Sequence, residues 1–400
     1  MRHPAILPRL ALSVAPLLAA VCPAAAQDDG APADPLGLRG QWSQFASSVV
    51  AGDGEGATRY GGRLDGYARI DGEAAGIADG LAINLHAEFV YGRSINRVGS
   101  KTLLPVNAAM NFPANDQEAF DLSINLVQRI GKLRLQLGKI DLFDASSAIP
   151  IVAGGGKEGF QHIGLAAPPG LIASPKVLGA IVSAPVGRVV LNIGVWQPDD
   201  WTRDYWPHGF FEDGTNGMIA GVLPTRIGGK RGFHTLTLFL SSRRPRRDGF
   251  PDIRPPDGTA PLLPDYRSGA HLRYAVQQYL WQDPLDPTRG GGFFGHIGVS
   301  VGSPAILDWS LTAGIAGNVP FRGRPKDKFG LGYFRFSLAD RIVDGLRSSL
   351  PLSDEQGVEA YYTLQVGRAV RVSLSGQIVD PVLARAPNAV NLNLRAVADF

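Results

Sequence analysis

The sequence predicts an all-β protein: a transmembrane antiparallel β-barrel of about 16 strands, with short periplasmic turns and long extracellular loops. Three observations predict this fold: an alternating C-terminal segment, an N-terminal export signal, and a two-residue rhythm that recurs between them. In the segment 389–400 apolar and polar residues alternate, so a strand would place Leu394 on one face and Arg395 on the other. An outer-membrane barrel needs such a final strand, which here ends on Phe400, to close the sheet against the first strand.

The N-terminus has the parts of a secretory signal peptide, so we expect residues 1–26 to be removed on export. Basic residues precede an apolar stretch at 10–21, and three alanines at 24–26 form a small-residue cleavage site. Cys22 is the only cysteine, so the mature chain is expected to have no disulfide and no cysteine-ligated zinc site. Lipid attachment at Cys22 is the alternative, but Val21 fits that pattern poorly.

The rest of the chain divides into two parts by its patterning. Regular alternation begins at Arg63, and we therefore predict a barrel over 59–400. We predict that residues 27–58 form an N-terminal segment that lies in the periplasm or plugs the barrel. No uncharged apolar run of about 18 residues follows the signal, so no membrane helix is expected.

Segments of alternating polarity, most of them near the length of a tilted membrane strand, recur along the predicted barrel. They lie at 63–71, 81–91, 120–126, 133–137, 177–184, 189–197, 233–241, 268–281, 293–302, 306–316, 329–338, 357–366, 369–379 and 389–400. A further candidate at 218–223 would bring the set close to an even count of about 16.

The connections between these segments alternate in length. Tight turns are expected at Gly131, at 185–187 and at 367–368. Long connections are expected at 92–118, 142–176, 198–230, 242–267 and 339–356. Short turns at one end and long loops at the other are typical of a membrane barrel.

The polar faces of the strands are predicted to line the lumen. By parity these positions include Asp65, Arg69, Asn84, Glu88, Arg134, Arg335, Glu359, Gln365, Arg371, Gln377 and Arg395. Guanidinium groups offer a planar fork of donors and carboxylates offer acceptors, which together suit the paired hydroxyls of a sugar. An anion channel would more simply use a ring of charges of one sign. For any single position, plain hydration of a pore is the simpler explanation.

Several segments, in order and spacing, resemble one family of porins. They are Gly37-Leu38-Arg39, 60–67, 81–96, 135–141, 320–333, 355–362, 377–381 and 388–400. In these segments the chain resembles the carbohydrate-selective porins of the OprB family. The resemblance implies a sixteen-stranded outer-membrane barrel for sugar uptake in a Gram-negative bacterium.

The candidate sugar-binding residues combine lumen parity with this resemblance. Lys139, Asp141, Arg322 and Arg324 are included because they lie in the matched segments. The full set of predicted pore-lining residues is Arg69, Glu88, Arg134, Lys139, Asp141, Arg322, Arg324, Arg335, Glu359, Arg371 and Gln377.

The sequence gives no support for an enzyme. Gly154-Gly155-Gly156-Lys157 lacks both the earlier glycine and the hydroxyl residue of a phosphate-binding loop. The histidines are scattered without a His-Glu-x-x-His pair, and no Gly-x-Ser-x-Gly elbow is present. We therefore expect no catalytic residue, no metal and no cofactor, although a serine and a histidine on adjacent strands remain an alternative. The basic residues are not clustered on one face, so no nucleic-acid partner is expected.

The predicted function is passive, sugar-selective diffusion of carbohydrates across the cell outer membrane into the periplasm. The alternatives are a general or anion-preferring porin, and a plugged structural or adhesive outer-membrane barrel. Expected partners are mono- or disaccharides, outer-membrane lipid and lipopolysaccharide, and the assembly machinery, which would recognise the strand ending at Phe400.

Two further segments each have two interpretations. The aromatic residues of 196–211 either anchor the barrel or pack a loop, or they stack on sugar faces, and we favour the first. The basic run 243–247 lies in or near a long loop and either faces water or binds phosphates of lipopolysaccharide, and we again favour the first.

Overall fold

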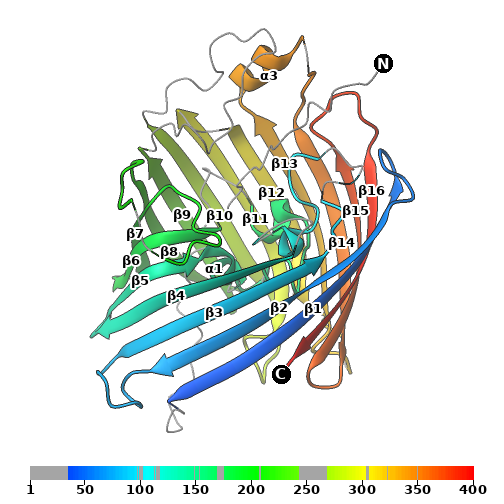
Figure 1. Ribbon diagram of the computed structural model, residues 1–400. Coiled ribbons are helices and arrows are strands. Elements are labelled where there is room, and N and C mark those ends of the chain that lie inside the picture. The colour runs from blue at the N-terminus through cyan, green and yellow to red at the C-terminus, as the bar shows by residue number, and fades with distance from the viewer. Residues whose placement is uncertain are drawn as a thin grey trace.

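The described part of the chain forms one closed antiparallel barrel (Figure 1). The computed structural model describes residues 35–96, 98, 102–111, 113, 118–147, 149–152, 154–168, 175–206, 209–242, 268–302, 306–321, 323–348 and 350–400. The predicted signal peptide, Arg322 and the basic run 243–247 therefore lie outside the described residues.

The barrel has 16 strands, which confirms the predicted fold class. The strands are β1 (Leu36–Ala51), β2 (Thr58–Asp71), β3 (Leu81–Gly92), β4 (Ala119–Ile130), β5 (Leu133–Asp141), β6 (Lys176–Val186), β7 (Val189–Trp196), β8 (Asn216–Ile227), β9 (Lys230–Ser241), β10 (Gly269–Gln282), β11 (Gly290–Gly302), β12 (Leu307–Asn318), β13 (Lys328–Leu338), β14 (Glu355–Val366), β15 (Val370–Asp380) and β16 (Ala389–Asp399). The helices are η1 (Ala108–Met110), α1 (Leu142–Ser147), α2 (Ile163–Ala166) and α3 (Asp340–Leu346). Among the described residues, no helix is long and apolar enough to cross a membrane.

The two ends of the chain close the barrel. β1 pairs with β16 from Gln41 opposite Asp399 onward, so the predicted closing role of the last strand is confirmed. Gly40 donates its N–H to the carbonyl oxygen of Phe400 at 2.6 Å and accepts the Phe400 N–H at 3.0 Å. A Cβ atom at position 40 would lie 2.2 Å from the Phe400 ring, so glycine leaves room for the terminal aromatic side chain.

The barrel begins earlier than the sequence analysis predicted. Residues 36–51, which were assigned to a periplasmic or plug segment, instead form β1 within the barrel wall. The downstream part of β1 mixes polar and apolar residues on both faces, with Gln44 and Ser48 on one face and Phe45 and Val49 on the other, which obscured its alternation. The candidate at 218–223 lies within β8, so the connection predicted at 198–230 is divided by a strand.

One end of the barrel carries short turns and the other carries most of the long connections. Gly131 and Gly187 have positive φ angles of 56° and 60° in tight turns, where an L side chain would be strained. At the opposite end lie the connections 93–118, 142–175 and 197–215. The alternation of connection lengths thus follows the prediction, whereas the assignment of the two ends to periplasm and exterior remains a prediction.

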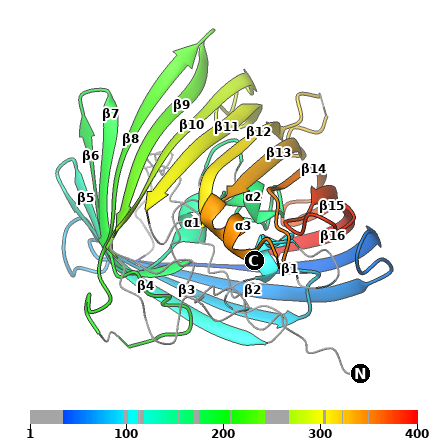
Figure 2. The same ribbon diagram turned by 90° about the horizontal axis from the view of Figure 1, so that it is seen from above.

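The outward face of the barrel is apolar where the pattern predicted it. Leu392 and Leu394 of β16 are 48% and 51% exposed, whereas Asn393 and Arg395 point inward and are buried. Because these inward-facing side chains are buried, other parts of the protein must fill some of the barrel interior. Viewed along the barrel, α1 and α2 lie inside the ring of strands (Figure 2).

Candidate functional site

Two long connections fold into the barrel and cover one side of its inner wall. The first is loop 93–118 and the second is loop 142–175, and they hold each other through the Ala108 N–H to Gln161 O bond at 2.8 Å and the Ile163 N–H to Pro105 O bond at 3.0 Å. Both pack against inward side chains of β11–β16, which we call the covered wall. The structure thus has two loops whose described residues fold inward and narrow the lumen.

Aromatic side chains of the covered wall pack against α2 and the residues just before it. His162 stacks on Phe334 with ring centroids 4.0 Å apart, and Phe160 meets Tyr361 edge-on at 4.9 Å. A Cβ atom at Gly332 would lie 2.8 Å from Leu165, so glycine lets α2 approach the strand closely. These residues form the largest apolar cluster of the described chain, and it lies inside the barrel.

Two predicted pore-lining residues of the covered wall bind loop backbone. The carboxylate of Glu359 accepts the N–H groups of Gln161 and His162, each at 2.8 Å. Gln377 donates its amide to the carbonyl oxygen of Val106 at 2.9 Å. Both side chains point inward as predicted, but the loops bury them. Their polar groups therefore satisfy loop backbone and do not face open space.

Loop 142–175 is also held by ionic contacts. Arg371, another predicted residue, lies 3.2 Å from Glu158 of the loop and donates to Asp399 at 2.7 Å. Lys328 donates to Glu158 at 2.9 Å. Burial by itself would raise the pKa of the Glu158 carboxyl. The positive charges of Lys328 and Arg371 outweigh that effect, so this pKa lies below its ordinary value, at about 2. Burial alone lowers the pKa of His162 to about 3, so this imidazole is neutral at ordinary pH.

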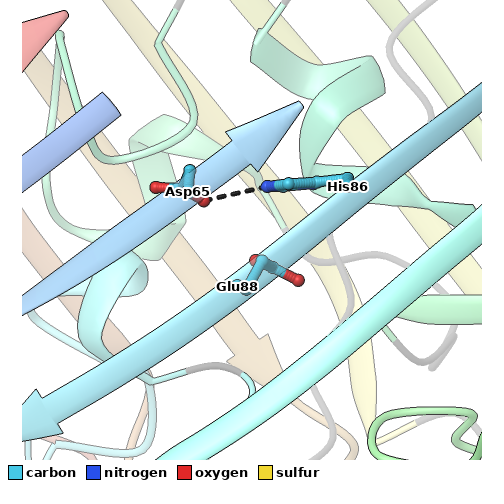
Figure 3. A group of neighbouring side chains, drawn as sticks. All are labelled: Asp65, His86 and Glu88. Carbon is cyan, nitrogen blue, oxygen red and sulfur yellow. Dashed lines mark hydrogen bonds and ion pairs between the residues drawn. The ribbon is translucent and has the colours of Figure 1, made fainter. Parts of the chain in front are cut away.

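Across the lumen, the inward faces of β2–β5 form a second surface, which we call the open wall. At its loop-side edge, Asp65 accepts from Nε of Arg63 at 2.9 Å and lies 2.9 Å from Nε2 of His86 (Figure 3). Arg63 also donates to Glu88, a predicted residue. Tyr67 stacks on the His86 ring at 4.1 Å. These side chains form a buried ionic cluster rather than an open binding surface.

Lys176 extends this cluster to the start of β6. Its ammonium contacts both Glu88 and the predicted residue Asp141. Nδ1 of His86 lies 2.8 Å from Asp144 of α1. Two triads here have ligand atoms close enough for a metal, Asp65–His86–Glu88 and His86–Asp141–Asp144. However, Arg63 and Lys176 already bind these carboxylates, so side-chain cations supply the positive charge.

The predicted residue Lys139 closes a gap between two strands. β4 and β5 pair only between Asn125–Ile130 and Leu133–Gly138, and they separate beyond that point. Lys139 donates to Asp121 at 2.6 Å and to the carbonyl oxygen of Asp204 at 3.0 Å. The described residues around Asp204 in the connection 197–215 thus cover the gap in the wall where β4 and β5 are no longer paired.

The aromatic segment 196–211 divides between packing and exposure. Trp196 is buried inside the barrel beside Ile181 and Phe239. Tyr205 lies along the outward-facing Phe120, with its hydroxyl donating to the Phe120 carbonyl at 2.9 Å. Among the described residues of 196–211, Trp196 and Tyr205 therefore pack against other side chains. This agrees with the favoured interpretation that the segment anchors the barrel or packs a loop.

A cavity of about 1130 Å³ borders the open wall toward the short-turn end of the barrel. A ladder of polar side chains crosses four strands along its side. Arg69 donates to Asn84 at 3.3 Å, and Asn84 donates to Asn125 at 3.2 Å. Gln136 donates to Asn125 at 3.1 Å, and Arg134 donates to Gln136 at 3.1 Å. These five residues, the open-wall ladder, all line the cavity.

The structure thus brings two predicted residues, Arg69 and Arg134, to the two ends of one polar surface. Sequence analysis placed Asn84 at lumen parity, and Asn125 and Gln136 lie on the polar faces of the predicted strands 120–126 and 133–137, but the three amides were not connected. The signal was present, because each lies at lumen parity on consecutive strands. Only the register between strands brings the five side chains to one level.

Two predicted residues lie away from the lumen. Arg335 was assigned to the lumen by parity, and this assignment is wrong: it pairs in register with Leu311 and Gln356 on the outward face and binds Asp354 at 2.8 Å. The inward face of β13 carries Phe334 because loop 142–175 covers it, so polarity does not mark the inside there. Arg324 lies in the connection 319–327 and binds Asp327 at 2.7 Å.

Comparison with known proteins agrees with this architecture. Residues 235–376 match the family model described as carbohydrate-selective porin, OprB family. The predicted resemblance to the OprB family is confirmed. The match runs from β9 into β15, so it includes most of the covered wall but not the open wall. No curated protein sequence matches the chain.

Solved structures of an OprB protein share the fold. The high-pH structure of Pseudomonas putida OprB is similar with a TM-score of 0.76 and 15% sequence identity, over 92% of this chain and 94% of that chain. The low-pH structure of the same protein gives a TM-score of 0.52 and 14% identity, over 92% and 93% of the two chains. The family match over residues 235–376 and the closed barrel of 16 strands agree with the prediction of an outer-membrane porin of the carbohydrate-selective class.

Proposed function

We propose that sugars diffuse passively past the open-wall ladder, which binds them weakly and does not change them chemically. The carrying observation is the ladder itself, five linked polar side chains beside a cavity of about 1130 Å³. Amides offer a donor and an acceptor side by side, and guanidinium groups offer donors only. A sugar hydroxyl both donates and accepts, so such a surface suits it.

The inward loops support this role by narrowing the passage. Because they fill the covered wall, solute is directed against the opposite side of the lumen. Each hydrogen bond to a sugar contributes only about 0.5–1.5 kcal/mol after exchange with water. Binding of this strength recruits the solute and still releases it, as conduction requires.

Several finer statements belong to the same proposal. We infer that residues 1–26 direct export, that the strand ending at Phe400 is recognised by the assembly machinery, and that outer-membrane lipid contacts the outward apolar face. We also infer that the chain carries out no catalysis. The basic run 243–247 lies outside the described residues, so the favoured interpretation, a run that faces water, and the alternative of lipopolysaccharide binding both stay predictions.

The test is single-channel recording in a planar bilayer with the mature chain, residues 27–400. Glucose and maltose are titrated while the open-channel current is measured. Saturable, concentration-dependent block by either sugar supports a sugar site within an open pore. An open pore without block would make the protein a general porin. No conductance at all would favour the plugged structural barrel.

A further inference from the structure

The charges around the cavity are not balanced in the same way on both sides. Four carboxylates line it, and each has a cationic partner within the described chain. Asp141 contacts Lys176, and Asp144 lies 2.8 Å from Nδ1 of His86. The other two are also paired, Glu158 with Lys328 at 2.9 Å and Asp399 with Arg371 at 2.7 Å.

Apart from Arg63, which binds Asp65 and Glu88, the arginines beside the ladder lack close carboxylate partners among the described residues. Arg134 donates through Nη2 to a neutral amide, and its Nη1 is buried without a hydrogen-bond partner among the described residues. Arg129 lies directly opposite Arg134 in the strand register, which places a second positive charge beside the first. Arg69 has a long ion pair with Asp71, whose carboxylate lies 3.9 Å from Nη2, and both side chains are partly exposed.

A third arginine adds to this surface. Arg39 lines the cavity from β1, and its guanidinium lies 4.2 Å from the centre of the Tyr67 ring. Among the described residues, no carboxylate forms an ion pair with Arg39. The open wall is therefore cationic at both ends of the ladder and neutral between them.

We propose that the open-wall ladder selects sugar acids, meaning sugars that carry a carboxylate, over neutral sugars. This inference rests on the proposed function and names its substrate class. A guanidinium binds a carboxylate through two parallel hydrogen bonds, which are about twice as strong as neutral ones. The amides of Asn84, Asn125 and Gln136 then take the hydroxyls. The two features together favour a ligand with both groups.

Length agrees with this assignment. The ladder runs from β2 to β5, and three spacings between neighbouring strands amount to about 14 Å. A monosaccharide acid therefore contacts one arginine and the central amides at once. A small anion without hydroxyls would contact an arginine but leave the amides unused.

The test compares glucuronate, glucose and acetate as blockers of the purified mature chain in planar bilayers. We expect glucuronate to block at a concentration about tenfold lower than glucose, because of the charge-assisted hydrogen bonds. Raising KCl from 0.1 M to 1 M shortens the Debye length from about 10 Å to about 3 Å, so it should weaken glucuronate block and leave glucose block unchanged.

Variants locate the effect. Arg134→Gln and Arg69→Gln should remove most of the tenfold preference, because they weaken glucuronate block more than glucose block, and Arg134→Lys should retain part of the preference because the charge remains. Arg335→Gln is the matched control, since this arginine faces outward and should change nothing. Heat-modifiable migration on gels shows that each variant is folded.

The outcomes separate the two proposals. Glucose block without a preference for glucuronate overturns the sugar-acid inference and leaves the proposed function intact. Acetate block as strong as glucuronate block also overturns it, because the hydroxyls then contribute nothing. If neither sugar blocks the channel, both proposals fail.

Discussion

The covered wall and the open wall use the same kinds of polar residue for different purposes. On the covered wall, Glu359 and Gln377 are buried and bind the backbone of the inward loops. On the open wall, Arg69, Asn125 and Arg134 face a cavity, and their hydrogen bonds go to the amide side chains of Asn84 and Gln136. The difference teaches that a polar residue pointing into a barrel lines a pathway only where no loop covers it.

The largest expected effect lies in the ionic cluster at the edge of the open wall. Lys176→Met would leave the carboxylates of Glu88 and Asp141 buried without their shared ammonium. We expect a loss of about 3–5 kcal/mol in the free energy of unfolding. Thermal unfolding followed by circular dichroism in detergent micelles measures it.

Lys328→Met is the matched control for that change. Its ion pair with Glu158 is partly exposed, with 28% of the lysine side chain accessible, so its loss should cost less than about 1 kcal/mol. Equal losses in the two variants would contradict a special role for the buried cluster.

The next effect concerns attachment of a loop to the covered wall. In Glu359→Gln an amide replaces the carboxylate and retains one acceptor oxygen, so one of the N–H groups of Gln161 and His162 loses its partner. An unsatisfied buried N–H costs about 1–3 kcal/mol. We expect faster proteolysis of loop 142–175 and a larger open-channel conductance.

The reciprocal swap Gln356→Glu serves as its control, because residue 356 faces outward on the same strand. It should leave both protease sensitivity and conductance unchanged. A conductance unaffected by Glu359→Gln would show that the loop is held without this carboxylate.

Acid should loosen the same loop. The pKa of His162 is lowered by burial to about 3, while the ordinary value is 6.5. Between pH 6.5 and 3 the displaced loop binds a proton that the packed loop excludes. Packing is therefore fully stable above pH 6.5 and weakens as the pH falls, by up to about 1.4 kcal/mol per pH unit. Protease sensitivity measured across this pH range reports the change.

His162→Asn isolates this contribution. Asparagine retains an acceptor at the N-cap of α2, which His162 supplies to the Gly164 N–H at 3.1 Å, but it does not titrate. The acid-induced rise in protease sensitivity should be smaller in this variant. Identical pH profiles for the two proteins would assign the acid response to other groups.

The smallest effect is expected in the middle of the ladder. Asn125→Ala removes the amide that joins Asn84 to Gln136, without touching the inward loops. Stability should change by no more than about 0.5 kcal/mol, since the site faces a water-filled cavity. The concentration of sugar needed for half block should rise about twofold to tenfold. Ile124→Ala, on the outward face of the same strand, should leave block unchanged.

The sequence by itself determined the strands and much of the wet surface, because alternation is a local property that neighbouring residues carry. It placed Leu394 outward and Arg395 inward, and it put Arg69, Glu88 and Arg134 in the lumen, all as found. The tertiary structure alone decided which of these side chains face open space. Arg335 points outward and Phe334 inward because α2 packs on that wall, and the ladder exists because register aligns β2–β5. What covers a face, and what lies beside it on the next strand, depends on contacts between residues far apart in the chain.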